Sequence, residues 1–281
     1  MKYGMNLLLW TGNVTEEHFP LLAALKKTGY DGVELPLFGG EAAHYQKVGR
    51  ELKNLGLGAT AVTVCGAENN PVSPDAAVRQ KAVDHIKWAV DMTATAGGEV
   101  LCGPYHSALG VFSGTGPTDE EKKRAADVLR KAAEHAQQAK VMLGIEYLNR
   151  FECYVLTTAR DARALVQAVG HPNFRMMYDT FHANIEEKDL PATIASVLDS
   201  VAHVHISEND RGTPGTGHVH WDETFRALKK GGYDGWLVVE AFSRALPDLA
   251  AATRIWRDLF PSMEEVYTQG LRFMKEKWAA A

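Results

Sequence analysis

Four potential metal ligands each end an apolar segment in the second half of the chain. They are Glu146 in V-M-L-G-I-E, Asp179 in F-R-M-M-Y-D, His205 in V-A-H-V-H and Glu240 in W-L-V-V-E. Carboxylates with one imidazole suit Mn²⁺, Mg²⁺ or Co²⁺, whereas structural zinc favours thiolates. Such a cation can polarise a carbonyl and stabilise an enediolate, while the carboxylates beside it move a proton. The pattern predicts a metal-dependent enzyme.

Eight short apolar runs alternate with longer helical patterns along the chain. The expected strands are Tyr3–Leu9, Asp31–Leu35, Ala59–Val64, Val100–Cys102, Val141–Glu146, Arg175–Asp179, Val201–Ile206 and Trp236–Glu240. Their mostly continuous apolar character is typical of parallel strands buried on both faces. We predict an α/β fold with residues 1–281 as a single (β/α)8 TIM barrel, whose carboxyl strand ends meet at one face. A doubly wound sheet is second choice, because no Gly-rich phosphate loop follows the first strand.

Helix start signals fall between these strands. Thr118 and Glu121 form a capping box, and Thr158 with Asp161 repeats the pattern. Ser73-Pro74 predicts a further start, with proline in the first helical position. A last segment, Ser262–Trp278, predicts an extra C-terminal helix packed on the barrel or on a partner subunit.

Composition excludes several classes of protein. The chain has 281 residues, 46% hydrophobic and 23% charged, typical of a soluble globular protein. The net charge of -5, without a basic block, argues against a nucleic-acid partner. Its three dispersed cysteines argue against a disulfide framework. No apolar run reaches membrane-span length and no signal peptide is evident, so we expect no membrane partner and a cytoplasmic location.

Each candidate ligand also has a purely structural interpretation. A single carboxylate at a strand end is as often an ion-pair partner as a ligand. His203 lies on the same strand face as His205 and deeper, so it is the better candidate for a hydrogen-bonded core histidine. Four polar strand ends together are much harder to explain in this way.

Polar residues that follow the strand ends are candidates for substrate binding. Glu152 lies six residues after Glu146, His182 lies in D-T-F-H, and Arg211 lies in S-E-N-D-R-G. Histidine and arginine beside a cation can hold substrate hydroxyl or carbonyl oxygens. Arg211 could also be an ordinary loop cation that pairs with Glu208 or Asp210. Three aromatic residues are candidates for the pocket wall or for packing: Trp10, Tyr105 and Phe242.

Four stretches of the sequence resemble the ketose 3-epimerases of the D-tagatose, D-allulose (D-psicose) and L-ribulose types, within the xylose isomerase-like TIM barrels. They are E-Y-L-N-R-F-E from Glu146, Y-D-T-F-H-A-N-I-E-E from Tyr178, H-V-H-I-S-E-N-D-R-G from His203 and Y-D-G-W-L-V-V-E-A-F from Tyr233. The resemblance covers the whole chain and implies an isomerase that inverts C3 of free ketoses through a cis-enediolate. The substrate pairs would be D-fructose/D-allulose, D-tagatose/D-sorbose or ribulose/xylulose.

The same resemblance implies a role for each site residue. Glu146, Asp179, His205 and Glu240 would bind a divalent cation, with Mn²⁺ first and Mg²⁺ or Co²⁺ as alternatives. Glu146 and Glu240 would also act as the acid/base pair, one on each face of the sugar. Glu152, His182 and Arg211 would hold the oxygens at carbons one to three. The resemblance also implies a homodimer or homotetramer.

Two positions depart from the family pattern. Asn6 and Val14 stand where relatives have aromatic residues that line the pocket for the distal end of the sugar. Preference at carbons 4 to 6 is therefore open, whereas the metal and enediolate chemistry is unaffected.

Other activities remain open at this point. A hydroxypyruvate-type aldose–ketose isomerase or an inosose-type dehydratase on the same barrel would also stabilise an enediolate beside a metal. An abasic-site endonuclease occurs on a related barrel, although the acidic charge balance counts against it. A non-catalytic sugar-binding barrel would bind sugar without exchanging the C3 proton.

Overall fold

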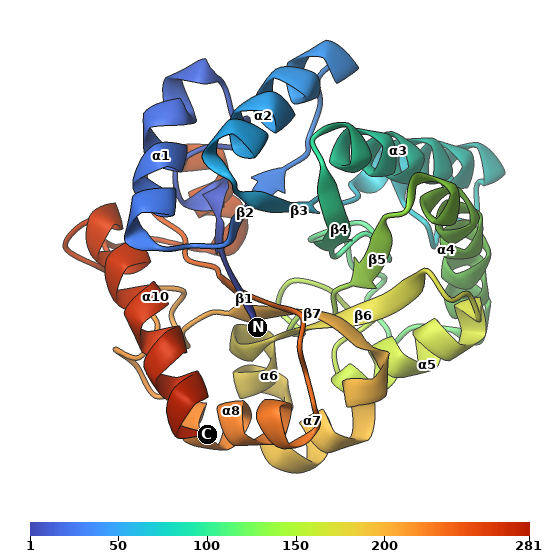
Figure 1. Ribbon diagram of the computed structural model, residues 1–281. Helices are drawn as coiled ribbons and strands as arrows, with labels where there is room; N and C mark the ends of the chain where they lie inside the picture. Colours follow the sequence, from blue (N-terminus) through green and yellow to red (C-terminus); the bar gives the residue numbers. More distant parts are fainter.

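Eight parallel strands close into a barrel in the computed structural model, which describes residues 1–281 (Figure 1). The strands are β1 Lys2–Asn6, β2 Gly32–Pro36, β3 Gly58–Val62, β4 Gly98–Gly103, β5 Met142–Ile145, β6 Phe174–Asp179, β7 Val201–Ile206 and β8 Trp236–Val239. They are ordered β1 to β8 around the barrel, and β8 pairs with β1 to close it. The predicted (β/α)8 fold is confirmed.

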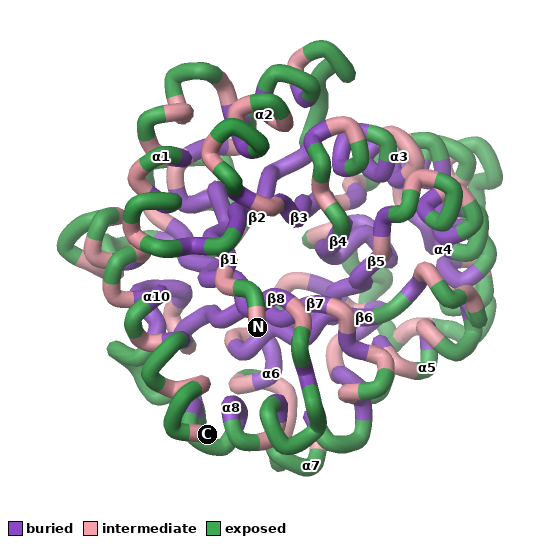
Figure 2. Tube along the Cα trace, viewed as in Figure 1, coloured by how far each residue is buried: buried purple, intermediate pink, exposed green.

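Helices surround the barrel on its outside (Figure 1). They are α1 Phe19–Thr28, α2 Ala42–Leu55, α3 Ala76–Thr95, α4 Asp119–Ala139, α5 Ala159–Val169, α6 Thr180–Glu186, α7 Leu190–Val197, α8 Trp221–Lys230, α9 Pro247–Thr253 and α10 Met263–Ala280. Figure 2 shows buried residues along the strands and exposed residues on the outer helix faces. The main hydrophobic core, with 65 buried residues, lies between these two layers. No helix is long and apolar enough to cross a membrane.

Local capping explains where several helices begin. Thr118 accepts a hydrogen bond from the Glu121 amide and the Glu121 carboxylate accepts one from the Thr118 amide, which confirms the predicted capping box of α4. Thr158 caps α5 as expected. The predicted C-terminal helix is present as α10, which begins at the Ser262 cap and packs on the barrel beside α8 and β1.

Several expected strand ends differ from the observed ones by one or two residues, as in Ala59–Val64 against Gly58–Val62. Two boundary predictions were wrong for a reason that the structure shows. The first strand ends at Asn6, because the Asn6 side chain accepts a hydrogen bond from the Leu8 amide and starts a 3-10 turn at Leu7–Leu9. Helix α3 does not begin at Ser73-Pro74. Its N-cap is Asp75, whose carboxylate accepts from the Ala77 amide, since aspartate is as good a cap as serine.

Trp236 fills the amino-terminal end of the barrel interior. A Cβ built on Gly32 would lie 2.5 Å from the indole, and one on Gly58 would lie 3.1 Å from it. Glycine at these positions lets neighbouring strands close around a large ring. The amino-terminal end of the barrel interior is therefore closely packed. The polar part of the interior lies toward the carboxyl ends of the strands.

Candidate active site

The four predicted ligands all lie at the carboxyl ends of strands β5 to β8. Asp179 is the last residue of β6 and His205 lies within β7, whereas Glu146 and Glu240 follow β5 and β8 directly. All four side chains are buried. Strands β5 and β8 are three positions apart in a ring of eight, so Glu146 and Glu240 enter the site from different sides of the barrel.

One nitrogen of His205 faces two carboxylates. His205 Nδ1 lies 3.4 Å from Asp179 Oδ2 and 3.3 Å from Glu240 Oε1. Within the protein, His205 Nδ1, Asp179 Oδ2 and Glu240 Oε2 have no hydrogen-bond partner, although all three are buried. Buried polar atoms without partners are uncommon in native proteins, so convergent ones point to a bound species.

Glu146 completes this arrangement through a second, overlapping group of possible ligands. Glu146, Asp179 and His182 have ligand atoms within 4.8 Å of one another, and so do Asp179, His205 and Glu240. The Glu146 Oε1 atom is 3.5 Å from His182 Nε2. Asp179 therefore belongs to both groups, and the structure brings the four predicted ligands into one cluster.

Local structure holds Asp179 in this position. Its Oδ1 caps helix α6 by accepting hydrogen bonds from the amides of Phe181 (2.6 Å) and His182 (3.2 Å). Capping at a helix N-terminus fixes the carboxylate and favours its negative charge. Oδ2 consequently points to the centre of the cluster.

The electrostatics of the cluster favour a positive charge at its centre. Burial and the neighbouring Glu240 carboxylate raise the pKa of Glu146 well above its ordinary value. Burial alone would lower the pKa of His205, but the carboxylates of Glu34 and Glu240 outweigh it and raise that pKa well above the ordinary value. Three carboxylates and one imidazole form a hard, oxygen-rich donor set that fits Mn²⁺, Mg²⁺ or Co²⁺.

The three predicted substrate-binding residues contact one another beside this cluster. Arg211 donates from Nη1 to Glu152 Oε1 at 2.8 Å, and its Nη2 lies 3.3 Å from His182 Nε2. The Arg211 guanidinium also lies 4.0 Å from the Phe181 ring centre and 5.0 Å from that of Phe242. Arg211 is therefore buried and pairs with Glu152, rather than with Glu208 or Asp210 of its own loop.

His182 is oriented by the loop after β5. The backbone amide of Asn149 donates to His182 Nδ1 at 2.9 Å. A neutral ring must then carry its hydrogen on Nε2, toward Glu146. Burial lowers the pKa of His182, which favours the neutral ring. His182 can thus offer one N–H to an oxygen atom in the site.

Sequence reasoning missed Glu34, a fully buried carboxylate on β2. Its Oε1 lies 2.7 Å from His205 Nε2, and its Oε2 lies 2.8 Å from His203 Nε2. The available signal was a charged residue inside the apolar run G-V-E-L-P. His203 is fully buried, but neither of its ring nitrogens makes a hydrogen bond within the protein, so its role as a hydrogen-bonded core histidine stays a prediction.

The aromatic candidates for the pocket wall have different surroundings. Trp10 lies near Tyr267 of α10, with ring centres 6.0 Å apart. The Tyr105 hydroxyl donates to the Leu101 carbonyl inside the core. Phe242 packs against the guanidinium of Arg211, a predicted site residue.

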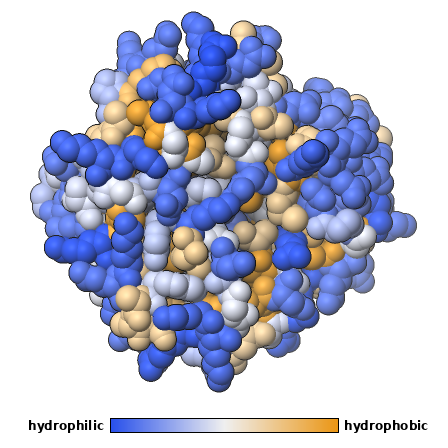
Figure 3. Space-filling model, in the orientation of Figure 1, coloured by the Kyte–Doolittle hydropathy of each residue, from blue (hydrophilic) through white to orange (hydrophobic).

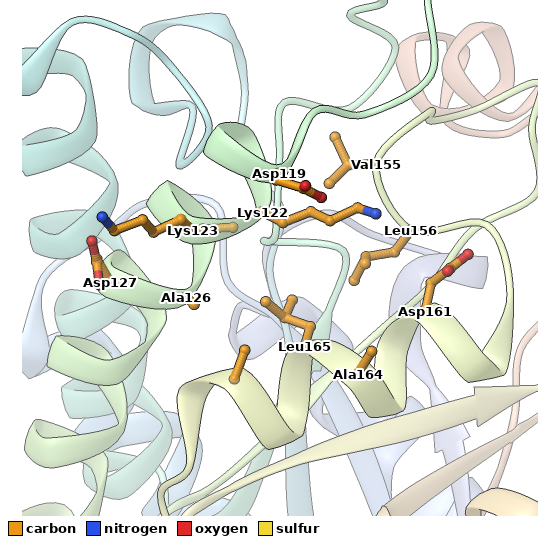
Figure 4. Close-up of a pocket in the computed structure, with 12 residues that line it drawn as sticks. Asp119, Lys122, Lys123, Ala126, Asp127, Val155, Leu156, Asp161, Ala164 and Leu165 are labelled. Atoms are coloured by element: carbon orange, nitrogen blue, oxygen red, sulfur yellow. The ribbon is translucent and has the colours of Figure 1, made fainter.

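A separate pocket of about 370 Å³ lies on the outer wall between α4 and α5 (Figure 4). Val155, Leu156 and Leu165 give it an apolar floor, and Lys122 extends across it. It contains none of the predicted site residues. The surface in Figure 3 is mostly hydrophilic with small apolar patches.

The sequence matches a family model described as xylose isomerase-like TIM barrel over residues 22–277. It is 33% identical to a ketose 3-epimerase of Arthrobacter globiformis, covering 100% of this chain and 98% of the relative. It is 28% identical to an L-ribulose 3-epimerase of Methylomonas sp. (strain DH-1), covering 99% and 98%.

Solved structures show the same similarity. A D-allulose 3-epimerase from Methylomonas sp. in complex with D-allulose superposes with a TM-score of 0.92 at 27% identity, covering 99% of this chain and 97% of that one. An L-ribulose 3-epimerase superposes with a TM-score of 0.92 at 28% identity, covering 100% and 95%.

Proposed function

The chain belongs to the ketose 3-epimerase family of xylose isomerase-like TIM barrels and is an isomerase that acts on carbohydrates, and from this premise we propose that it inverts C3 of free ketoses with the help of a divalent cation. The observation that supports this most directly is the cluster of Glu146, Asp179, His205 and Glu240, with buried, unpartnered polar atoms at its centre. A ketose is the small-molecule partner that this reaction requires.

Glu146 and Glu240 are the proposed acid/base pair. Inversion requires removal of the C3 proton on one face of the sugar and its return on the other, so a single base would only restore the starting configuration. The two carboxylates reach the cluster from β5 and β8. One takes the C3 proton to leave a cis-enediolate, and the other delivers a proton from the opposite face.

Glu146, Asp179, His205 and Glu240 are also the residues that would hold the cation. We propose Mn²⁺ first, with Mg²⁺ or Co²⁺ as alternatives. When bound, the cation would supply positive charge to offset the negative charge that develops on the substrate oxygens. The same carboxylates would then be both ligands and bases, which keeps the bases beside C3.

Glu152, His182 and Arg211 are proposed to hold the oxygens at carbons one to three. The fixed Nε2–H of His182 and the guanidinium of Arg211 are donors, whereas Glu152 accepts. Holding these oxygens in one orientation presents C3 to the two carboxylates and reduces the entropy lost on reaching the transition state.

A substrate panel in D₂O tests the proposed reaction. The protein with Mn²⁺ is incubated with D-fructose, D-tagatose and ribulose, and products are identified by NMR. We expect D-allulose, D-sorbose and xylulose, with deuterium at C3. An aldose product would favour an aldose–ketose isomerase, a dehydrated product would favour a dehydratase, and sugar binding without exchange at C3 would contradict catalysis.

The pocket for the distal end of the sugar is expected to differ from that of relatives. Asn6 is fully buried and donates to Glu34 Oε1 at 2.9 Å, so its side chain lies in the barrel interior. Val14 is also buried. We therefore propose a different preference at carbons 4 to 6, which the relative rates across the same panel measure.

Three further properties belong to this proposal. We propose that residues 1–281 form a single domain, which one cooperative unfolding transition would support. We propose a homodimer or homotetramer, which light scattering would measure. We also propose a cytoplasmic location, supported by three free, buried cysteines and testable by cell fractionation.

A further inference from the structure

The Glu34 carboxylate has four hydrogen-bond partners in the barrel interior. Its Oε1 accepts from Asn6 Nδ2 at 2.9 Å and lies 2.7 Å from His205 Nε2. Its Oε2 accepts from the Thr60 hydroxyl at 2.9 Å and from the Cys102 thiol at 3.1 Å. An ionised carboxylate has about four acceptor sites, so these partners occupy Glu34 almost completely.

This contact determines which nitrogen of His205 carries hydrogen. A carboxylate oxygen only accepts, so a nitrogen 2.7 Å from Glu34 Oε1 must donate, and Nε2 therefore carries the hydrogen. When a cation replaces the second ring proton, the imidazole is neutral and its lone pair lies on Nδ1. That atom faces Asp179 Oδ2 and Glu240 Oε1 and has no hydrogen-bond partner.

The barrel wall makes this orientation rigid. Glu34 lies on β2 and is held by residues from β1, β3 and β4, while His205 extends from β7 on the other side of the interior. Both side chains are completely buried. Ring rotation would require the Glu34 contact to break without water to replace it, which is costly for a buried charge.

A second metal site at Glu34, Cys102, His203 and His205 is the competing interpretation, because their ligand atoms also lie within 4.8 Å of one another. The distances argue against it. Donors bound tetrahedrally to one zinc ion at about 2.0–2.1 Å are separated by about 3.3 Å. The Glu34 oxygens lie 2.7 Å from His205 Nε2, where they make a hydrogen bond, and 2.8 Å from His203 Nε2, and both separations are shorter than that spacing.

On the basis of the cation site proposed above, we propose that Glu34 is a positioning residue. It fixes His205 as the Nε2–H tautomer with Nδ1 directed at the cation, and thereby sets cation affinity. Glu34 touches neither the substrate nor the cation in this arrangement. Removal of a carboxylate that orients a metal-binding histidine typically weakens metal binding by about 10- to 100-fold.

The first test measures Mn²⁺ affinity by calorimetry in metal-free wild type and in Glu34→Gln. We expect the dissociation constant to rise by about 10- to 100-fold. The matched control is Glu208→Gln, because Glu208 is also fully buried and accepts from the amides of Gly215 and Val219 and the Trp221 indole. Glu208 makes no hydrogen bond or ion pair with His205, so we expect stability to fall without a comparable change in Mn²⁺ affinity.

The second test needs no variant at Glu34. Wild-type protein labelled with ¹⁵N-histidine and loaded with diamagnetic Mg²⁺ is studied by long-range ¹H–¹⁵N NMR, with His205→Gln used to assign the signal. We expect the Nε2–H tautomer. The Nδ1–H tautomer, or a Glu34→Gln protein with wild-type Mn²⁺ affinity, would overturn the positioning role while leaving the proposed epimerase intact.

The two proposals fail in distinguishable ways. Full epimerase activity in metal-free wild type that binds no Mn²⁺ would overturn both the cation site and the role of Glu34. Weakened Mn²⁺ binding in Glu34→Gln, with no wild-type epimerisation of any ketose in the panel, would support the role of Glu34 and contradict the proposed reaction.

Discussion

At the residue scale, His205 is the centre of the proposed site because its two nitrogens face different carboxylates. Nε2 lies against Glu34 inside the barrel, and Nδ1 faces Asp179 and Glu240 at the strand ends. One side chain therefore joins the hydrogen-bonded Glu34 carboxylate to a cluster that contains unpartnered polar atoms. The Glu34 carboxylate has its hydrogen-bond partners within the protein, whereas Asp179 and Glu240 each have an unpartnered oxygen. Residue type alone does not reveal this difference between a structural carboxylate and a proposed ligand.

Replacement of Glu240 is expected to stop turnover. Glu240→Gln keeps the shape of the side chain but removes the negative charge, so the variant loses both a base and a cation ligand. We expect kcat to fall by at least about 100-fold, with unchanged circular dichroism. Glu276→Gln on the exposed face of α10 is the control and should keep the wild-type rate. A wild-type rate in folded Glu240→Gln would contradict the mechanism.

His106 is expected to make the protein less stable in acid. Burial lowers its pKa to about 3, against about 6.5 in an unfolded chain. Between these values the unfolded state binds a proton that the native state does not, so the free energy of unfolding falls as pH drops below about 6.5. At pH 5 this residue alone accounts for a loss of about 2 kcal/mol.

Urea unfolding at pH 7 and pH 5 checks this expectation. The loss of stability between the two pH values should be smaller in His106→Gln by about 2 kcal/mol. His218→Gln, at an exposed position in the loop before α8, should show the wild-type loss. Equal losses in His106→Gln and wild type would show that His106 does not cause the pH dependence.

At the scale of elements, strand spacing depends on glycine at the crowded end of the barrel. Gly32 starts β2, two residues before Glu34, and a Cβ there would lie 2.5 Å from both the Gly58 carbonyl oxygen and the Trp236 ring. Neither backbone nor a buried indole moves easily. The placement of Glu34 therefore depends on a residue that has no side chain.

Substitution of this glycine tests the argument. Gly32→Ala forces an extra methyl group into a packed site, and we expect it to lower the free energy of unfolding by about 1–3 kcal/mol. In Gly39→Ala the new methyl group would have no neighbour within 4 Å. Chemical denaturation of both variants measures the difference. If Gly32→Ala were as stable as Gly39→Ala, strands β2 and β3 could move apart at little cost, which would contradict the argument.

At the scale of the whole molecule, four strands converge on one cluster of like charges. Glu146, Asp179 and Glu240 are buried together, and their mutual repulsion opposes closure of the barrel unless positive charge offsets it. His205 offers some of that charge. A bound cation would offer more, so cation binding and barrel stability are expected to be coupled.

Metal removal tests this coupling. Dialysis against a chelator should abolish epimerase activity and lower the melting temperature, and Mn²⁺ or Co²⁺ should restore both. A cation present at 100 times its dissociation constant stabilises the native state by about 2.7 kcal/mol. Scanning calorimetry before and after addition measures the shift. Full activity and an unchanged melting temperature in metal-free protein would exclude the cation's role.

The amino-acid sequence by itself determined the barrel and the strand-end positions of Glu146, Asp179, His205 and Glu240. These features depend on continuous apolar runs and local caps such as Thr118 with Glu121, and both act over a few residues. The exact ends of the strands and helices were harder to predict. The side chains of Asn6 and Asp75 cap the segments that follow them, and the apolar pattern does not reveal these hydrogen bonds.

Only the tertiary structure decided the role of Glu34. Its partner His205 is 171 positions away along the chain, and no local pattern relates two residues at that separation. The strand pattern placed a charge inside an apolar run, but closure of the barrel brought β2 and β7 to the same interior. A buried carboxylate needs hydrogen-bond partners, and His205 is one of the partners that Glu34 finds in this interior.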